Sequence, residues 1–109
     1  MDLLNKRCVS CEGGTPSFTK TQAEEYLKET SGLILKSDGK SISREFSFGD
    51  FNESIAFINK VADLAEAESH HPDIYIFYNR VKLELSTHAI GGLSENDYIL
   101  AAKINQILK

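Results

Sequence analysis

The chain has 109 residues, with 12 basic and 16 acidic side chains and a formal net charge of -4, and this length fits one domain with a single core. Lys and Arg do not gather in a stripe, which argues against direct nucleic-acid binding through the phosphate backbone. No segment approaches the roughly 20 apolar residues that cross a bilayer, and the first residues lack a long apolar region. We therefore expect a cytoplasmic protein with no membrane partner.

The first 16 residues are rich in Gly, Ser, Thr and Cys and end at Pro16. They offer little to pack, so we predict a flexible N-terminal arm over residues 1–16 and a single domain over residues 17–109. Cys8 and Cys11 form a CxxC motif in this arm. Because a structural zinc site normally needs four ligands and the chain has no second such pair, reduced thiols without a metal or redox role are the favoured interpretation.

A first helix is predicted to begin at Thr19, which forms a capping box with Gln22, and to end before Ser31-Gly32. The capping pair satisfies backbone N–H groups that have no partner inside the first turn. An apolar side at helical spacing follows it and indicates that one face of this helix is buried.

Two strands should follow, over residues 33–36 and 41–48, joined by Asp38-Gly39, one of the strongest short hairpin signals. Leu35 would then face Ile42 across the hairpin. Alternation along the second strand predicts an apolar side with one misfit, formed by Ile42, Arg44, Phe46 and Phe48.

A second helix is predicted over residues 50–67, opened by Asp50 with Glu53. Its apolar positions form one broad stripe, made of Phe51, Ile55, Phe57, Ile58, Val61, Ala62, Leu64 and Ala65. The stripe is wider than one sheet face needs. Part of this helix is therefore expected to cover a second subunit, with a wide core contact as the alternative.

A second hairpin is predicted from two alternating runs, residues 74–78 and 81–85, on either side of an Asn79-Arg80 loop. In the register that follows, Tyr78 faces Val81 and one face of the hairpin is apolar throughout. Exposed aromatic side chains on the other face, Tyr75 and Phe77, would either stack on a flat ligand or bury against another chain.

All three histidines of the chain flank this hairpin. His70 and His71 precede it and His88 follows it, so the register brings His71 opposite His88 at the open end. Because an unperturbed histidine has a pKa near 6.5, a cluster of them can supply both a proton donor and an acceptor at neutral pH. We interpret this cluster as a candidate site for acid-base chemistry.

Gly91-Gly92 should turn the chain into a final helix that begins at Ser94 with Asp97. Asp97 is placed either to cap that helix or to orient His88. Glu66, one helical turn before His70, either faces the site or is an exposed glutamate at a helix end. The predicted order is αββαββα, an α+β sandwich of two layers with a four-stranded antiparallel sheet and three helices on one face.

The pattern His70-His71-Pro72, hairpin, Thr87-His88, Gly92-Leu93-Ser94 and Asp97 closely resembles the pterin-4a-carbinolamine dehydratases (4a-hydroxytetrahydrobiopterin dehydratases). The resemblance runs from the first helix to the end of the chain. It implies dehydration of a 4a-hydroxytetrahydropterin to the quinonoid dihydropterin, which recycles the cofactor of aromatic amino acid hydroxylases. It implies no metal and no cofactor.

The same resemblance implies the roles of particular residues. His70, His71 and His88 would be catalytic, with the assignment of acid and base left open. Glu66, Pro72 and Asp97 would bind the substrate or hold a histidine.

Members of this family also imply partners other than the pterin. A homodimer or homotetramer is expected, with an aromatic amino acid hydroxylase as a pathway partner. Animal relatives act as dimerisation cofactors of a homeodomain transcription factor, so a binding module that acts through the second helix is the alternative. A metal-dependent hydrolase built on the three histidines ranks last, because their spacing matches no local zinc signature.

Overall fold

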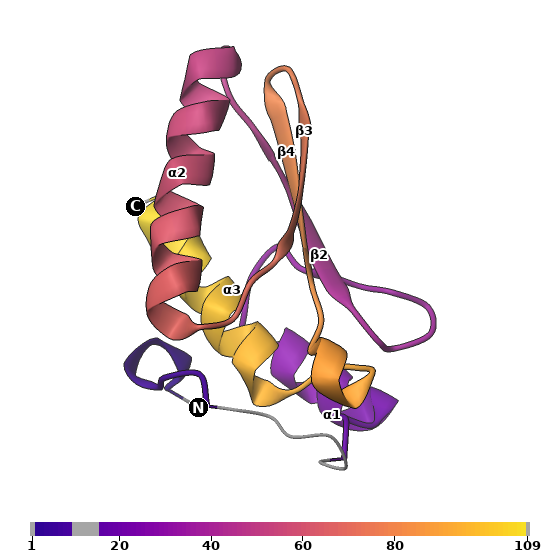
Figure 1. The fold of residues 1–109 in the computed structure, drawn as a ribbon. Coiled ribbons are helices and arrows are strands. Elements are labelled where there is room, and N and C mark those ends of the chain that lie inside the picture. The colour runs from indigo at the N-terminus through magenta and orange to yellow at the C-terminus, as the bar shows by residue number, and fades with distance from the viewer. Residues whose placement is uncertain (1, 10–15, 109) are drawn as a thin grey trace.

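The computed structural model describes residues 2–9 and 16–108. The predicted order of helices and strands is confirmed, with two short 3-10 helices in addition (Figure 1). In chain order the elements are η1 (Leu3–Asn5), α1 (Lys20–Leu27), β1 (Ile34–Leu35), β2 (Ile42–Ser47), α2 (Phe51–Glu68), β3 (Asp73–Phe77), β4 (Arg80–Leu85), η2 (His88–Ile90) and α3 (Glu95–Ile107).

The sheet has four antiparallel strands in the order β1-β2-β4-β3, so the two hairpins lie side by side. Figure 1 shows α2 and α3 along one side of this sheet. α1 packs against α3 and β1. The predicted α+β class is therefore confirmed. None of the helices in the described ranges is both long and apolar enough to span a membrane.

The helices begin where their capping residues predict. Thr19 and Gln22 form the reciprocal capping box of α1, with Gln22 N–H donating to Thr19 Oγ1 at 3.2 Å. Asp50 accepts from the N–H of Glu53 at 2.8 Å at the start of α2. These side chains stabilise the first turns by satisfying N–H groups that lack a partner within the helix.

The first hairpin has the predicted pairing of Leu35 with Ile42. Arg44, the misfit on the apolar side of β2, lies with its guanidinium 4.7 Å from the centre of the Phe46 ring. Its Nη1 donates to Ser31 O at 3.3 Å and to the side chain of Asn105. The charge on this face is therefore held by an aromatic ring and by polar partners.

The predicted register of the second hairpin is wrong. Phe77 pairs with Arg80, so the loop is Tyr78-Asn79 and Ile76, not Tyr78, faces Val81. The physical reason is the central position of β4: Arg80 also pairs with Ser47 of β2, which keeps it in the strand and out of the loop. The change moves the pairing by two positions, so the predicted faces of the hairpin are preserved.

The register correction also removes the predicted pairing of His71 with His88. Continued past the strands, the observed register brings His71 level with Ser86. The histidines still meet at this end of the hairpin, because the segments before β3 and after β4 both lie there.

The broad apolar stripe of α2 divides between two sides of the helix. The buried side, which faces the core, consists of Ser54, Phe57, Val61 and Ala65. Phe51, at 46% exposure, and Ala62 lie outside the core. The stripe is therefore wider than the core contact, and an apolar outer side of α2 is exposed in the single chain. Coverage of this side by a second subunit stays a prediction.

Residues 2–9 of the expected arm pack against the domain. Leu3 is buried in the core, and Lys6 Nζ lies 2.8 Å from Glu95 Oε2 at the start of α3. Cys11 and the other residues of the 10–15 segment lie outside the described residues. The division of the chain at residue 16 stays a prediction.

Candidate active site

A hollow of about 370 Å³ lies beyond the open end of the β3–β4 hairpin, where α2 ends and α3 begins. All three histidines line it, as the sequence predicts. Its lining consists of Val9, Ser69, His70, His71, Ser86, Thr87, His88, Ala89 and Asn96. Figure 1 shows these segments converging at the lower end of the molecule, below β4 and beside the first turn of α3.

Two backbone reversals carry the histidines into this hollow. Ser69 ends α2 in the left-handed region with φ 53°, and the N–H of His70 then donates to Ala65 O at 3.2 Å. On the other side, Thr87 forms an isolated bridge with Gly92, which closes the loop that holds His88. Gly91 in this loop has φ 67°, a conformation that favours glycine.

Asp97 is fully buried and organises one side of the hollow. Its Oδ1 lies 2.6 Å from His70 Nε2. Its Oδ2 accepts from Thr87 Oγ1 at 2.9 Å and from the N–H of Ser94 at 3.0 Å. A buried carboxylate needs such partners, because an unpaired charge in the interior is costly.

These contacts define where the protons lie around Asp97. Thr87 gives its hydroxyl proton to Asp97, so the hydroxyl of Ser94, 2.8 Å away, donates to Thr87 in turn. An ionised carboxylate can only accept hydrogen bonds, so pairing with Asp97 selects the His70 tautomer that has its proton on Nε2 and its lone pair on Nδ1. Asp97 therefore fixes the orientation of the His70 ring, and Nδ1 of that ring is placed to act as a base.

His71 has a weaker anchor than His70. Its Nε2 lies 2.7 Å from Glu66 Oε1, but both side chains are exposed. Pairs of this kind in water contribute little to stability. His88 is also exposed, and its ring makes no hydrogen bond to the parts of the chain that the structure describes.

The predicted substrate-binding residues are placed differently from the histidines. Glu66, Pro72 and Asp97 do not themselves line the hollow. Glu66 contacts His71 and Asp97 contacts His70, and both of these histidines line the hollow. Asp97 therefore orients His70 and not His88, the histidine named in the sequence analysis. Their substrate-binding role stays a prediction.

Sequence reasoning assigned no site role to five residues of the hollow, which are Val9, Ser69, Ser86, Ala89 and Asn96. Val9 lies in the expected arm, and Asn96 directly precedes the capping residue Asp97. Neither Val9 nor Asn96 belongs to a sequence motif that indicates a binding role. Thr87 and Ser94 belong to the recognised pattern, but their hydrogen bonds around Asp97 depend on tertiary contacts.

Cys8 lies beside this hollow and is half-buried. Its Sγ is 3.5 Å from Asn96 O. Burial, and then the nearby Glu68 carboxylate, raise the pKa of the Cys8 thiol to about 12, so the thiol stays protonated at neutral pH and is a poor nucleophile. Within residues 2–9 and 16–108, no group of three or more His, Cys, Asp or Glu side chains is arranged to hold a metal ion.

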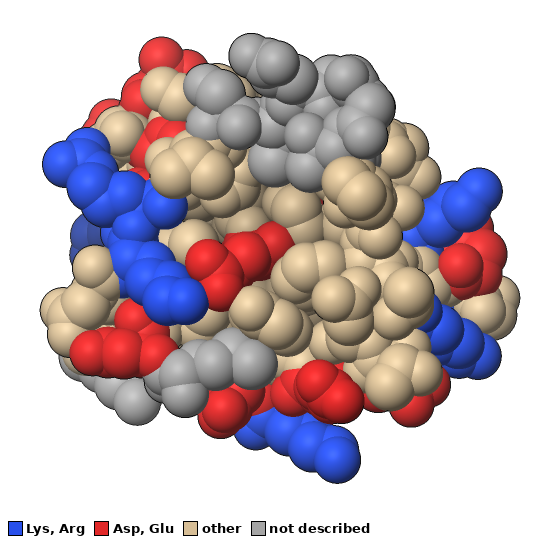
Figure 2. Space-filling model, turned by 90° about the horizontal axis from the view of Figure 1, so that it is seen from below, with Lys and Arg blue, Asp and Glu red and all other residues tan. Residues whose placement is uncertain are grey.

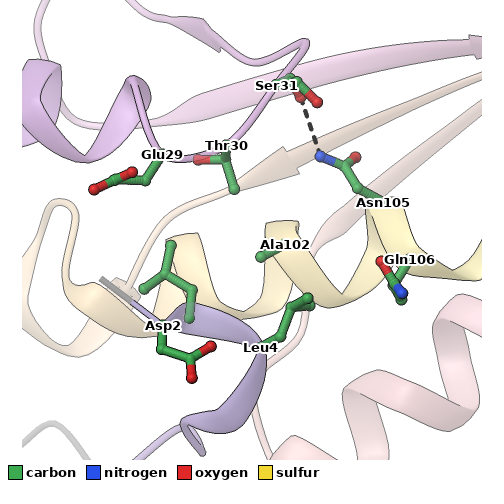
Figure 3. A pocket seen from close by; sticks show the side chains of 9 residues that line it. Asp2, Leu4, Glu29, Thr30, Ser31, Ala102, Asn105 and Gln106 are labelled. Carbon is green, nitrogen blue, oxygen red and sulfur yellow. Dashed lines mark hydrogen bonds between the residues drawn. The ribbon is translucent and has the colours of Figure 1, made fainter.

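Another hollow, of about 220 Å³, lies between η1, the segment after α1 and the outer side of α3 (Figure 3). Asp2 and Leu4 approach it from η1, and Glu29 and Thr30 from the opposite side. Asn105 Nδ2 donates across its edge to Ser31 O at 3.1 Å. No predicted site residue lines this hollow, so the histidine hollow is the better candidate for chemistry.

The lower face of the molecule carries both signs of charge (Figure 2). Lys and Arg side chains lie mainly toward its edge together with Asp and Glu, and an acidic group lies near its middle among residues that carry no charge. On the described part of this face, the charges therefore do not form a continuous basic stripe.

The model of the family described as "Pterin 4 alpha carbinolamine dehydratase" matches residues 16–107. The chain belongs to this family. It is 46% identical over 107 residues to a provisionally named pterin-4-alpha-carbinolamine dehydratase of Nitrosomonas eutropha, with 98% of this chain and 94% of that protein covered.

Solved structures share this fold, and one of them at 33% identity agrees with the family assignment. A crystal structure from Brucella melitensis, described as a transcriptional coactivator/pterin dehydratase, has a TM-score of 0.80 and 33% identity, and covers 85% of this chain and 99% of that one. A pterin dehydratase-like RuBisCO assembly factor of the alpha-carboxysome has a TM-score of 0.61 at 22% identity, with 70% and 88% covered, and shows likeness of fold alone.

Proposed function

We propose that this protein dehydrates a 4a-hydroxytetrahydropterin to the quinonoid dihydropterin by histidine acid/base catalysis. The observation that carries the proposal is the meeting of three histidines in one hollow, one of them held by a buried carboxylate. Membership of the dehydratase family supplies the substrate class.

The reaction needs two proton transfers on one bicyclic ring. A proton goes to the 4a-hydroxyl group, which leaves as water, and a proton is lost from N5, whose electrons form the new double bond. An acid and a base must therefore lie beside the same ring. The hollow meets this requirement, because His70 and His71 enter it from the end of α2 and His88 enters it from the segment after β4.

His70 is the proposed base. Asp97 accepts from its Nε2 at 2.6 Å, which fixes the ring and stabilises the imidazolium that forms when Nδ1 takes up a proton. His71 and His88 are exposed and line the same hollow as His70, so both are accessible to a bound ring. One of them delivers the proton to the 4a-hydroxyl and the other holds the ring.

The remaining roles follow from the family. Glu66 and Pro72, on either side of the His70-His71 pair, help to bind the pterin, and Asp97 does so through His70. In the cell the reaction would recycle the pterin cofactor of an aromatic amino acid hydroxylase. No resident metal or organic cofactor is part of the proposal.

The test is the rate at which purified protein converts freshly generated 4a-hydroxytetrahydropterin to quinonoid dihydropterin, followed by absorbance against the spontaneous reaction. Replacement of His70, His71 or His88 by alanine should lower turnover by about 10² to 10⁴, the usual contribution of a positioned acid or base. Tyr78→Ala, at the opposite end of the hairpin, is the control and should retain the wild-type rate. Rates within threefold of wild type for every histidine variant would contradict the proposal.

A binding module is the second candidate function, favoured by the exposed outer side of α2. Phe51 at 46% exposure and its neighbour Ile55 one turn on offer an apolar surface for another chain, either a second copy or a protein partner. If the folded protein does not accelerate the dehydration, we expect the binding role instead of the enzymatic one. Phe51→Glu would then reduce the assembly size measured by sedimentation, whereas loss of all three histidines would not.

A further inference from the structure

We propose that the N-terminal segment Lys6–Val9 is a wall of the pterin site, in which Val9 contacts the bound ring and Asn96 is the positioning residue that holds Val9 there. This inference rests on the proposed function. The segment lies before residue 16, where the match to the family model begins, so that match gives the segment no role.

The main anchor of the wall is a pair of hydrogen bonds between Asn96 and the backbone of Val9. Asn96 Nδ2 donates to Val9 O at 2.6 Å, and the N–H of Val9 donates to Asn96 Oδ1 at 3.0 Å. Both polar groups of one residue are therefore held by one buried side chain. A two-point contact of this kind fixes the orientation of the segment as well as its distance.

Further contacts hold the residues before Val9. The N–H of Cys8 donates to Glu68 Oε1 at 2.9 Å, and Lys6 Nζ donates to Glu95 Oε2 at 2.8 Å. Glu68 is itself held by Lys103 Nζ at 2.7 Å from the other oxygen. The segment is thus attached to the end of α2 and to the first turn of α3.

The first turn of α3 couples this wall to the proposed base. Asn96 holds Val9, and the next residue, Asp97, holds His70. Because both side chains leave the same rigid turn, the distance between Val9 and His70 is set by the helix. A substrate held against Val9 would therefore be held at a defined distance from His70, which is what a proton transfer needs.

Val9 itself is suited to contact a flat ring. Its side chain is 70% exposed although its backbone is held, so its apolar surface is not used by the core. Binding sites for heterocycles combine such apolar surface with a few polar groups, and here the histidines supply the polar groups. The wall should therefore contribute to substrate affinity more than to the chemical step.

The experiment uses two variants with matched controls. Val9→Trp places a bulky side chain on the rim, and Ile34→Trp makes the same change at a comparably exposed position on β1, where Ile34 is 67% exposed. Asn96→Leu removes the anchor, and Asn105→Leu removes an asparagine of the same helix that also makes two hydrogen bonds. Each protein is tested for affinity for a stable 7,8-dihydropterin, for KM and kcat in dehydration, and for amide hydrogen exchange at Cys8 and Val9.

We expect Val9→Trp and Asn96→Leu to raise both KM and the Kd for the dihydropterin by about tenfold, equivalent to about 1.4 kcal/mol, with kcat within threefold of wild type. Asn96→Leu should also speed exchange at Val9, and both controls should bind as wild type does. If wild type binds dihydropterin but Val9→Trp binds it equally well, the wall is refuted. If wild type neither binds a pterin nor turns one over, the proposed function fails first. Since Val9 is exposed, its variant decides the matter even if Asn96→Leu does not fold.

Discussion

At the scale of single residues, Asp97 serves the fold and the candidate site with the same carboxylate. It caps α3 through the N–H of Ser94 and holds His70 at 2.6 Å. Thr87 donates a further hydrogen bond to Asp97 and is itself bonded to the Ser94 hydroxyl, so both oxygens of the buried carboxylate have partners. A change at this position should therefore affect both stability and catalysis.

Asp97→Asn should lower the free energy of unfolding by about 1 kcal/mol, because the amide is a weaker acceptor for the capping N–H. It should also lower dehydration turnover by roughly 10²-fold, since His70 loses the partner that orients it. Asp50→Ala, at the start of α2, is the control: it should cost similar stability by removing the N-cap and leave turnover unchanged. Thermal unfolding and steady-state rates measure the two effects. Equal turnover in the two variants would show that Asp97 only caps the helix.

At the scale of elements, the β3–β4 hairpin is set by the sheet more than by its loop. Arg80 is paired on both sides, with Phe77 of β3 and Ser47 of β2. The loop therefore consists of Tyr78 and Asn79, and Tyr78 takes up φ 56°. A bulky residue in this region of backbone space is strained, and glycine is preferred there.

Tyr78→Gly should raise the melting temperature, because it relieves this strain by roughly 0.5 to 1 kcal/mol. Little packing is lost, since Tyr78 is 66% exposed. Tyr75→Gly, within β3, should instead lower stability by a similar amount, because glycine in a strand costs conformational entropy. Differential scanning calorimetry of the two variants compares them directly. A lower melting temperature for Tyr78→Gly would show that the loop is not strained.

At the scale of the whole molecule, Glu68 joins three parts of the chain. It lies at the end of α2, accepts from Lys103 of α3 at 2.7 Å, and accepts from the N–H of Cys8 in the N-terminal segment at 2.9 Å. The hydrogen bonds from Lys103 and Cys8 lower the pKa of Glu68 below its ordinary value of 4.5. Its carboxylate is largely buried, so this pairing is only weakly screened by solvent.

The lowered pKa predicts how stability depends on pH. Because the folded-state pKa lies below the unfolded value, the contribution of Glu68 is fully present above that value and is lost as the pH falls through the folded-state pKa. Glu68→Gln should therefore lower the free energy of unfolding at pH 7 by about 1 kcal/mol, with a lower melting temperature. The difference in melting temperature from wild type should shrink as the pH is taken well below 4.5.

Glu66→Gln is the matched control for Glu68→Gln, because it makes the same change on the same helix at an exposed carboxylate. Its melting temperature at pH 7 should lie close to that of wild type. Thermal unfolding followed by circular dichroism from pH 3 to pH 7 would distinguish the two. A difference for Glu68→Gln that is independent of pH would contradict the charge-based account.

The sequence by itself determined the helices and strands and the meeting of the three histidines. Capping residues such as Thr19 and Asp50 define helix starts through contacts three residues away, and Asp38-Gly39 defines a turn locally, so these features are legible without tertiary structure. The histidine pattern likewise lies within one hairpin and its flanks, which is why the convergence of His70, His71 and His88 was predictable.

Tertiary structure decided the features that depend on long-range contacts. The hairpin register follows from the pairing of β4 with β2, and the division of the α2 stripe follows from which side meets the core. The pairing of Asp97 with His70 and the position of Val9 beside the hollow join segments 27 and 87 residues apart. No local pattern encodes such contacts, because they arise only when the helices pack against the sheet and bring distant segments together.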